Sequence, residues 1–274
     1  MFVCGPGTLC RMSNSRPLVV IFPGMGMEAR YYRPIAEALT EAGFPTTVGE
    51  LRGQGESPHV ASRSNQWGYH HVAAEDYPAT ISNAKQEHGL DENHPVILLT
   101  HSMGGQVGTL FMARPEASAL NVIGMLGVGA GNPWHKAFPL RDQFKFGIGI
   151  QLIWLVSQVL GYWPGDKISI GGTWGRHPRT YINEWARMNR SGKRGKLAGA
   201  DIDYDAAMQR ITAPVVLTRF KNDRDCTYAS AQSLADQVAG ATVEELDGGL
   251  GHNRWAREPE IIVGRVLEFA QELQ

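Results

Sequence analysis

The 274-residue chain is long enough to bury a sizeable core, and its 43% hydrophobic content is ordinary for a globular protein. Its formal net charge of −1 indicates neither nucleic acid nor a membrane surface as a partner. The odd number of cysteines (Cys4, Cys10 and Cys226) cannot pair completely, so we read them as free thiols of a reducing compartment and expect a cytoplasmic protein. A charged start followed by a long apolar stretch is missing from the N-terminus, so we expect no signal peptide.

Strands and helices alternate along the first half of the chain. The run Leu-Val-Val-Ile-Phe at 18–22 predicts a strand, apolar spacing over 30–42 predicts a helix, and 44–51 predicts a second strand. The pattern continues with a helix, a strand, a helix and a strand over 75–88, 95–100, 104–113 and 122–128. This order predicts an α/β fold, in which a doubly wound, mostly parallel sheet has helices on both faces.

The alternation stops after Gly129 and resumes with a strand over 214–218. A helix, a strand and a final helix are then predicted over 228–239, 242–246 and 259–273. The interrupting segment carries 12 Lys and Arg against 6 Asp and Glu, whereas the rest of the chain is acidic. We therefore expect a core built from 1–130 and 213–274, with a mainly helical cap inserted over 131–212.

One stretch of the insertion, residues 147–163, is mostly apolar. It is shorter than 18 residues and contains Gln151, Ser157 and Gln158, which is too short and too polar for a membrane span. It predicts an amphipathic or buried helix.

The sequence Thr-His-Ser-Met-Gly-Gly at 100–105 follows the apolar run 95–99 directly. A buried strand that runs into a tight turn lifts the hydroxyl of Ser102 out of the sheet edge, and Gly104 and Gly105 let the next helix begin close behind the strand. A serine becomes a nucleophile only when a base takes its proton and a third group, usually a carboxylate, holds that base. We therefore look for a histidine and an acid after later strands, at the same edge of the sheet.

Two loops supply these candidates. The loop after 214–218 contains Asp223 and Asp225, and the glycine-rich loop after 242–246 contains His252. No other histidine falls in a corresponding loop, so His252 is the predicted base. The residues alone do not decide whether Asp223 or Asp225 is the partner of His252.

With this order of serine, acid and histidine, the sequence resembles the α/β-hydrolase family, closest to serine esterases and lipases with an inserted helical cap. The resemblance rests on His-Ser-Met-Gly-Gly at 101–105, the acid loop ending in Asp223, and Gly-His at 251–252. It covers the sheet core over 17–130 and 213–273. The spacing in that family favours Asp223 over Asp225 as the acid.

The resemblance also implies an oxyanion hole made by the backbone N–H groups of Met25 and Met103. The chain departs from the family at two positions, because Thr100 and Phe220 stand where the family usually has glycine. The implied reaction is hydrolysis of a carboxylic ester through an acyl-enzyme, with Ser102 as nucleophile and with no cofactor or metal.

The expected partner is a small-molecule ester with an apolar acyl or alcohol group, because the predicted cap is rich in aromatic residues. These are Trp134, Phe138, Phe144, Phe146, Trp154, Tyr162, Trp163 and Trp174. We expect no nucleic-acid partner and no stable membrane insertion, and a homodimer is left open. The alternatives are an acyltransferase or thioesterase with the same triad, and a catalytically silent binding protein on this scaffold.

The segment 24–29 also fits a dinucleotide-binding pattern, Gly-x-Gly-x-x-Ala, with Glu50 about 20 residues beyond. Pro23 directly precedes the first glycine, and a dinucleotide site would leave the serine, acid and histidine unexplained. We therefore disfavour it. His101 is expected to pack beside the turn.

Four other histidines and one basic run complete the candidates. Adjacent His70 and His71 point in different directions, which disfavours a metal pair. His135 and His177 lie in the insertion and are candidates for touching substrate. The run 187–196 has five basic residues and no acid. We interpret it as a solvated surface, or alternatively as a landing site for an anionic substrate group or an acidic membrane surface.

Overall fold

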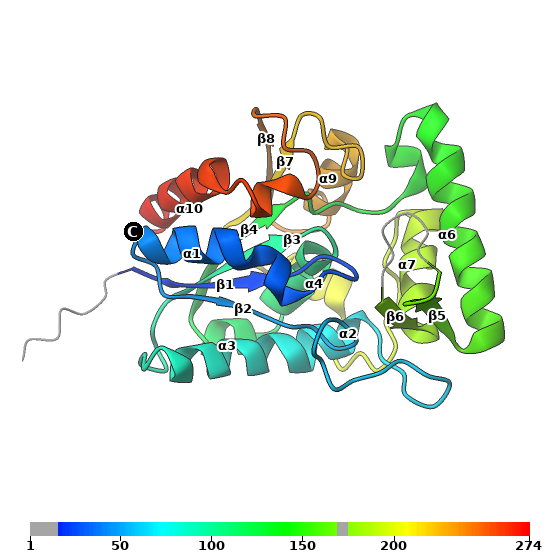
Figure 1. Cartoon of the computed structure of the whole chain (residues 1–274), viewed down its shortest axis with the longest axis horizontal. Helices are drawn as coiled ribbons and strands as arrows, with labels where there is room; N and C mark the ends of the chain where they lie inside the picture. Colours follow the sequence, from blue (N-terminus) through cyan, green and yellow to red (C-terminus); the bar gives the residue numbers. More distant parts are fainter. Residues whose placement is uncertain (1–15, 169–174) are drawn as a thin grey trace, which may run out of the picture.

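A computed structural model describes residues 16–168 and 175–274, so Cys4, Cys10 and Trp174 of the sequence analysis lie outside the described residues (Figure 1). Six parallel strands form the central sheet in the order β2-β1-β3-β4-β7-β8. They are β1 (Leu18–Phe22), β2 (Thr46–Val48), β3 (Val96–His101), β4 (Val122–Val128), β7 (Val215–Phe220) and β8 (Thr242–Leu246). The predicted α/β sheet is confirmed.

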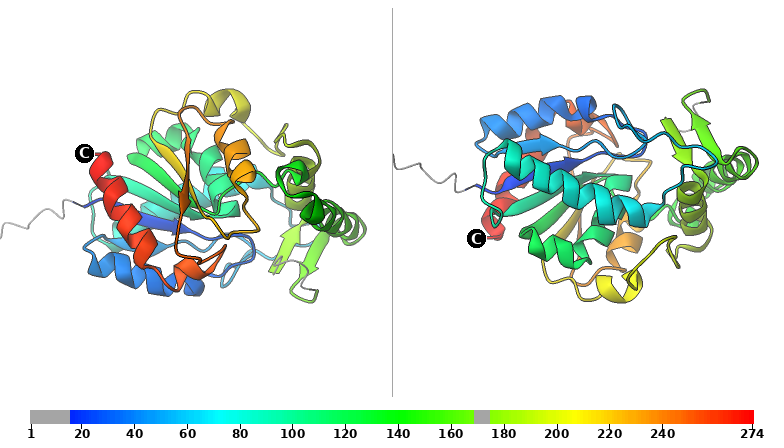
Figure 2. Two further views of the ribbon diagram at one scale, coloured as in Figure 1. Left: turned by 90° about the horizontal axis from the view of Figure 1, so that it is seen from above. Right: turned by 90° about the horizontal axis from the view of Figure 1, so that it is seen from below.

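Helices cover both faces of this sheet (Figure 2). On one face lie α1 (Arg33–Glu41) and α10 (Glu260–Glu272), and on the other α3 (Tyr77–Glu87), α4 (Met103–Met112) and α9 (Tyr228–Ala235). Consecutive strand residues pack into opposite layers: Val19 and Ile21 lie in the α1–α10 layer, and Leu18 and Val20 in the other. Because both faces are covered, the inner strands β1, β3 and β4 are mostly apolar and buried.

The strand order decides which loops meet at the edge of the sheet. From β1 the chain first adds β2 on one side and then crosses to β3 on the other. The loops after β1 and β3 therefore lie side by side at a switch point, where open parallel sheets bind their ligands. The loops after β7 and β8 are neighbours for the same reason.

Several helices and strands differ in extent from the sequence prediction. Strand β2 has three residues instead of eight, and α9 ends at Ala235 rather than at 239. The helix predicted from 75 begins earlier, as α2 (Tyr69–His71), and passes through a π-helical turn into α3. Tyr77 donates to the carbonyl of Val72, five residues back, and Pro78 has no N–H to continue a regular ladder.

Between β4 and β7 the chain adds no strand to the central sheet within the described ranges. It forms α6 (Leu140–Leu160), a two-stranded antiparallel pair of β5 (Tyr162–Gly165) and β6 (Gly175–Pro178), α7 (Arg179–Ser191) and α8 (Tyr204–Met208). Helices α6 and α7 pack together beyond one end of the sheet (Figure 1). The predicted apolar helix thus starts before 147, and it stops where Gly161 adopts φ 86°, a left-handed C-terminal cap.

The basic run 187–196 covers the end of α7 and the loop that follows it, and part of it is tied into the fold. Arg194 is only 3% exposed, and burial lowers its pKa to about 10. Arg187 donates to the carbonyls of Arg194 and Lys196, and Arg190 contacts Gln151 of α6. The prediction of a solvated surface is therefore wrong for Arg194, whereas Arg190, Lys193 and Lys196 are exposed.

Candidate active site

Ser102 occupies a strained turn between β3 and α4. Its φ of 50° and ψ of −116° lie outside the regions that non-glycine residues prefer. The turn is tight because α4 begins against the end of β1. A Cβ on Gly104 would lie 2.6 Å from the carbonyl oxygens of Phe22 and Pro23. Because Gly104 has no side chain, α4 can begin this close to β1, and Ser102 projects from the edge of the sheet.

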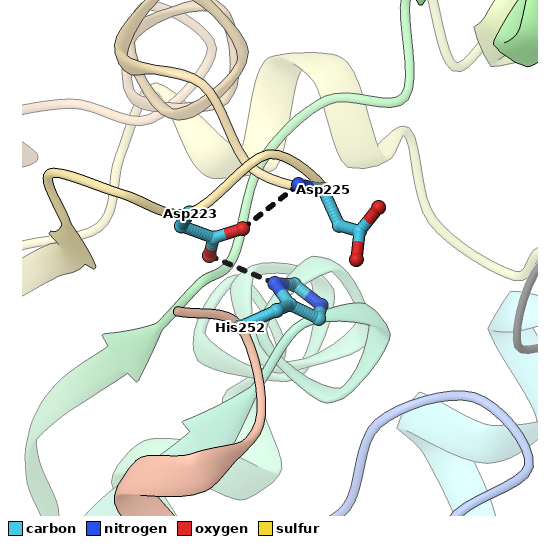
Figure 3. A group of neighbouring side chains, drawn as sticks. All are labelled: Asp223, Asp225 and His252. Atoms are coloured by element: carbon cyan, nitrogen blue, oxygen red, sulfur yellow. Dashed lines mark hydrogen bonds and ion pairs between the residues drawn. The ribbon is translucent and has the colours of Figure 1, made fainter. Parts of the chain in front are cut away.

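The structure brings Ser102, His252 and Asp223 together. The Nε2 atom of His252 lies 2.9 Å from the Ser102 Oγ, and its Nδ1 lies 2.8 Å from Oδ2 of Asp223. A carboxylate accepts only, so Nδ1 carries the imidazole proton and Nε2 accepts the hydrogen bond of the serine hydroxyl. Figure 3 shows the carboxylate of Asp223 facing the imidazole.

Asp223 is held more firmly than Asp225. It is 4% exposed, and its Oδ1 accepts the amides of Asp225 and Cys226 at 2.8 and 2.9 Å. The carboxylate of Asp225 is exposed and points away from Asp223 (Figure 3). In the described chain, Asp225 therefore supports its neighbour through its backbone, and the geometry favours Asp223 as the partner of His252.

A buried arginine shapes the acid loop. Arg219 donates to the carbonyls of Cys226 and Asp223, at 2.8 and 3.0 Å, and pairs with Glu245 of β8. Within the acid loop, the guanidinium therefore binds main-chain oxygens. Phe220, at the position where glycine was expected, is buried at the end of β7 and leaves Asp223 within reach of the histidine.

The environment of His252 raises its pKa. Burial alone lowers the pKa, but the hydrogen bond and charge of Asp223, together with the charge of Asp225, outweigh it. The net result lies above the ordinary value of 6.5. A base in this position is thus stronger than a free imidazole.

We expect this shift to set the acid limb of the pH profile. Only neutral His252 accepts the proton of Ser102, so kcat/KM falls as pH drops through the raised pKa, with its midpoint above 6.5. Initial rates measured on a soluble ester across the neutral range locate this midpoint. Asp225→Asn removes one of the charges that raise the pKa and should move the midpoint to lower pH. A midpoint at or below 6.5 in the wild type would contradict the assignment.

His101 links the turn to the loops on either side of it. Burial, reinforced by the nearby imidazole of His252, lowers its pKa well below the ordinary value, so it is neutral. Its Nδ1 lies 2.6 Å from the hydroxyl of Tyr32, which accepts the amide of Gly24. Its Nε2 lies 3.0 Å from the His252 carbonyl, which Trp255 also contacts through Nε1.

One proton arrangement satisfies every member of this network. Burial raises the pKa of Tyr32, so its hydroxyl stays protonated and donates to Nδ1 of His101. The other nitrogen of His101 then carries the proton and donates to the carbonyl of His252. The network fixes the loop after β1, the turn and the histidine loop relative to one another. His101 packs beside the turn, as predicted, whereas the contacts of Tyr32 and Trp255 were not predicted.

A cavity of about 160 Å³ opens at Ser102. Met25 and Met103, the predicted oxyanion donors, both line it. Met103 is the first residue of α4, so its amide has no intrahelical acceptor, and no acceptor for the Met25 amide occurs in the described ranges. Four large apolar side chains from the insertion complete the wall. They are Phe138, Phe146, Ile150 and Trp185.

The aromatic residues of the insertion have several different environments. Phe138 and Phe146 stack at 4.3 Å between ring centroids and line the cavity. By contrast, Phe144 is 73% exposed and Trp163 is buried away from Ser102. Trp185 of α7 was missed because it carries no motif.

The remaining candidates do not line this cavity. His70 bonds to the hydroxyl of Tyr204, His71 accepts the amide of Gly68, and His135 contacts the carbonyl of Asn189. His177 is buried beside Tyr181. Glu50, the residue required by a dinucleotide site, accepts the amide of Ala29.

One group in the described ranges could geometrically hold a metal ion. Ligand atoms of Asp223, Asp225 and His252 lie within 4.8 Å of one another. Two of these residues are already bonded to each other at 2.8 Å. The buried atoms of the group are therefore arranged as a hydrogen-bonded chain that ends at Ser102.

Comparisons with known proteins agree with this geometry at the level of the fold. The family model Hydrolase_4, described as serine aminopeptidase S33, matches residues 13–148, which include Ser102. The protein named "Putative carbamate hydrolase RutD" from Variovorax paradoxus (strain S110) is 24% identical over 256 residues, covering 92% of this chain and 90% of its own.

Two solved structures show the same fold. An esterase from Exiguobacterium antarcticum is 18% identical with a TM-score of 0.57, and the match covers 93% of this chain and 92% of the other. A structure from the work on the metagenome-derived lipolytic enzymes LipS and LipT is 15% identical with a TM-score of 0.58, over 95% and 98% of the two chains.

Proposed function

We propose that the chain, which shares the fold of solved α/β-hydrolases, is a serine hydrolase that cleaves carboxylic esters with an apolar acyl or alcohol group. One observation carries the proposal. The hydroxyl of Ser102, the imidazole of His252 and the carboxylate of Asp223 form a continuous chain of contacts of 2.9 and 2.8 Å. This arrangement turns a serine hydroxyl into a nucleophile.

The reaction follows from the roles of these groups. The Oγ of Ser102 attacks the acyl carbon while Nε2 of His252 takes its proton, and Asp223 stabilises the imidazolium that forms. The imidazolium then protonates the leaving alcohol, and the carbon–oxygen bond breaks to leave an acyl-enzyme. A water molecule, deprotonated by His252, then attacks the acyl carbon. The bond from this carbon to the Oγ of Ser102 breaks, the imidazolium returns the proton to Oγ, and the acid is released.

The negative oxygen of the tetrahedral intermediate needs donors that are already in place. We assign this role to the backbone N–H groups of Met25 and Met103, which belong to the two loops brought together by neighbouring β1 and β3. Removal of one such donor typically costs about 3 kcal/mol of transition-state stabilisation. The hydrogen bond from the Gly24 amide to Tyr32 helps to hold the first of these loops.

We further propose that residues 131–212 act as a cap that supplies the acyl or alcohol pocket. The cavity at Ser102 is bounded by Phe138, Phe146, Ile150 and Trp185, and among the described residues Asp225 is the one carboxylate on its wall. An apolar group gains by leaving water at such a wall. The cytoplasm remains the proposed location, since Cys226, the one described cysteine, is a buried free thiol.

A series of p-nitrophenyl esters tests the apolar pocket. Each methylene that enters it should raise kcat/KM by up to about fourfold, so we expect a rise from acetate to the medium chains. Phe146→Ala should flatten this dependence, whereas Ile261→Ala on distant α10 should not. A flat response in the wild type would remove the apolar pocket from the proposal.

A further inference from the structure

Helix α6 is apolar on two opposite faces. Its inner face packs into the molecule: Phe146 and Ile150 line the cavity at Ser102, and Ile153 is 3% exposed. Its outer face is a stripe at spacings of three and four residues, exposed by 44–85%. We call this stripe the outer α6 face. It consists of Leu140, Phe144, Ile148, Leu152, Leu155 and Val159.

The apolar outer face of α6 is explained neither by burial in the core nor by a membrane-spanning position. By length and composition, the helix could cross a membrane. Only 18% of its most apolar 18-residue stretch is buried inside the molecule, however, so it is not a core helix. A spanning orientation would break the bonds from Trp154 and Gln158 to Asn183 of α7, at 2.9 and 2.7 Å. It would also withdraw the inner face from the cavity. Monomeric soluble proteins rarely expose so large a contiguous apolar patch, so the outer α6 face calls for a partner surface.

In the described part of the chain, cations lie at both ends of this face. Arg141 lies at its N-terminal end with 72% of its side chain exposed, and Lys136 precedes it. At the other end, exposed Arg63 donates to the carbonyls of Val159 and Leu160. One carboxylate, Asp142, also lies on α6 and pairs with Arg141 at 3.4 Å, so the remaining positive charge at this end comes from Lys136.

This charge pattern distinguishes between two partners. A second copy, paired through the same face, would bring Arg141 against either Arg141 or Arg63 of the other copy, whichever way the helices run. Like charges at both ends oppose that contact. A bilayer with anionic headgroups presents the complementary charge around an apolar interior.

We propose that the outer α6 face docks the protein, with α6 lying flat, on a membrane surface that contains anionic lipids. The apolar stripe enters the boundary between headgroups and acyl chains, and the flanking cations contact lipid phosphates. The inner face of the same helix lines the cavity at Ser102, so docking brings the proposed ester pocket next to a lipid phase. The docking itself does not depend on the catalytic role of Ser102.

Vesicle flotation of full-length Ser102→Ala protein tests this proposal without lipid hydrolysis. We compare phosphatidylcholine vesicles with vesicles containing about 30% phosphatidylglycerol, and expect at least about fivefold tighter binding to the latter. About 0.5 M NaCl should remove most of that difference, because it screens the cations. Binding should survive in this variant even if the proposed ester hydrolysis proves wrong.

Substitutions locate the surface. Leu152→Gln combined with Leu155→Gln should weaken binding at least about tenfold, and Arg141→Gln about fivefold on anionic vesicles only. Ile261→Gln likewise replaces an exposed apolar side chain by glutamine, but on α10. This variant should bind vesicles as tightly as the Ser102→Ala protein does. Thermal unfolding shows that each variant is folded.

Two results would overturn the proposal. One is the failure of folded protein to bind either kind of vesicle, or binding that the paired glutamine substitutions leave unchanged. The other is a dimer in size-exclusion chromatography with light scattering that these substitutions dissociate. That second result would assign the outer α6 face to another copy of the chain.

Discussion

Ser102→Ala is expected to lower kcat for p-nitrophenyl ester hydrolysis by about 10⁴-fold or more, since the step that forms the acyl-enzyme loses its nucleophile. The substitution removes one oxygen from a partly buried position, so we expect the fold to be retained. Steady-state kinetics, with the thermal midpoint measured on the same preparations, separates lost chemistry from lost structure.

A second serine on the same cavity wall provides the matched control. Ser230 lines the cavity, but its hydroxyl donates to the carbonyl of Asn132 at 2.8 Å. Ser230→Ala should therefore cost activity only through local packing, far less than Ser102→Ala. Equal losses in the two variants, or full activity in Ser102→Ala, would remove Ser102 from the mechanism.

Asp223→Asn should lower kcat by about 10³- to 10⁴-fold. The amide group of asparagine can donate to Nδ1 of His252, which favours the tautomer that places the proton on Nε2. In that tautomer the imidazole cannot accept the proton of Ser102. Steady-state kinetics at the pH optimum measures the loss, and the unfolding transition checks the fold.

Asp225→Asn is the isosteric comparison in the same loop. Its carboxylate is exposed and only its amide supports Asp223, so the change should leave kcat on the pH plateau within a few-fold of the wild type. The two substitutions together decide between the acids that the residues left open. A larger loss from Asp225→Asn than from Asp223→Asn would show that the acid is assigned wrongly.

The parts of the fold that sequence predicted best depend on local patterns. The apolar runs of β1, β3 and β4 are unbroken because both faces of the sheet are covered, and the turn at Ser102 needs only adjacent residues and small glycines. The positions of Asp223 and His252 followed from a topological rule, since both stand after strands of a parallel sheet.

Contacts between distant residues were not predictable in this way. Tyr32 and His101 are 69 positions apart, and no sequence motif marks the tyrosine as a partner of the histidine. Trp185 reaches the cavity only because α7 packs beside α6, a placement that tertiary contacts decide. The outer α6 face was not predicted because periodicity cannot tell an exposed apolar face from a buried one when both sides of a helix are apolar.

Covalent trapping tests the central claim most directly. The folded wild-type protein is treated with a fluorophosphonate, and the modified residue is located by peptide mapping and mass spectrometry. We expect one adduct, on the Oγ of Ser102, that forms much more slowly in His252→Gln and Asp223→Asn. No adduct on folded wild-type protein, or an adduct that persists in Ser102→Ala, would contradict the account.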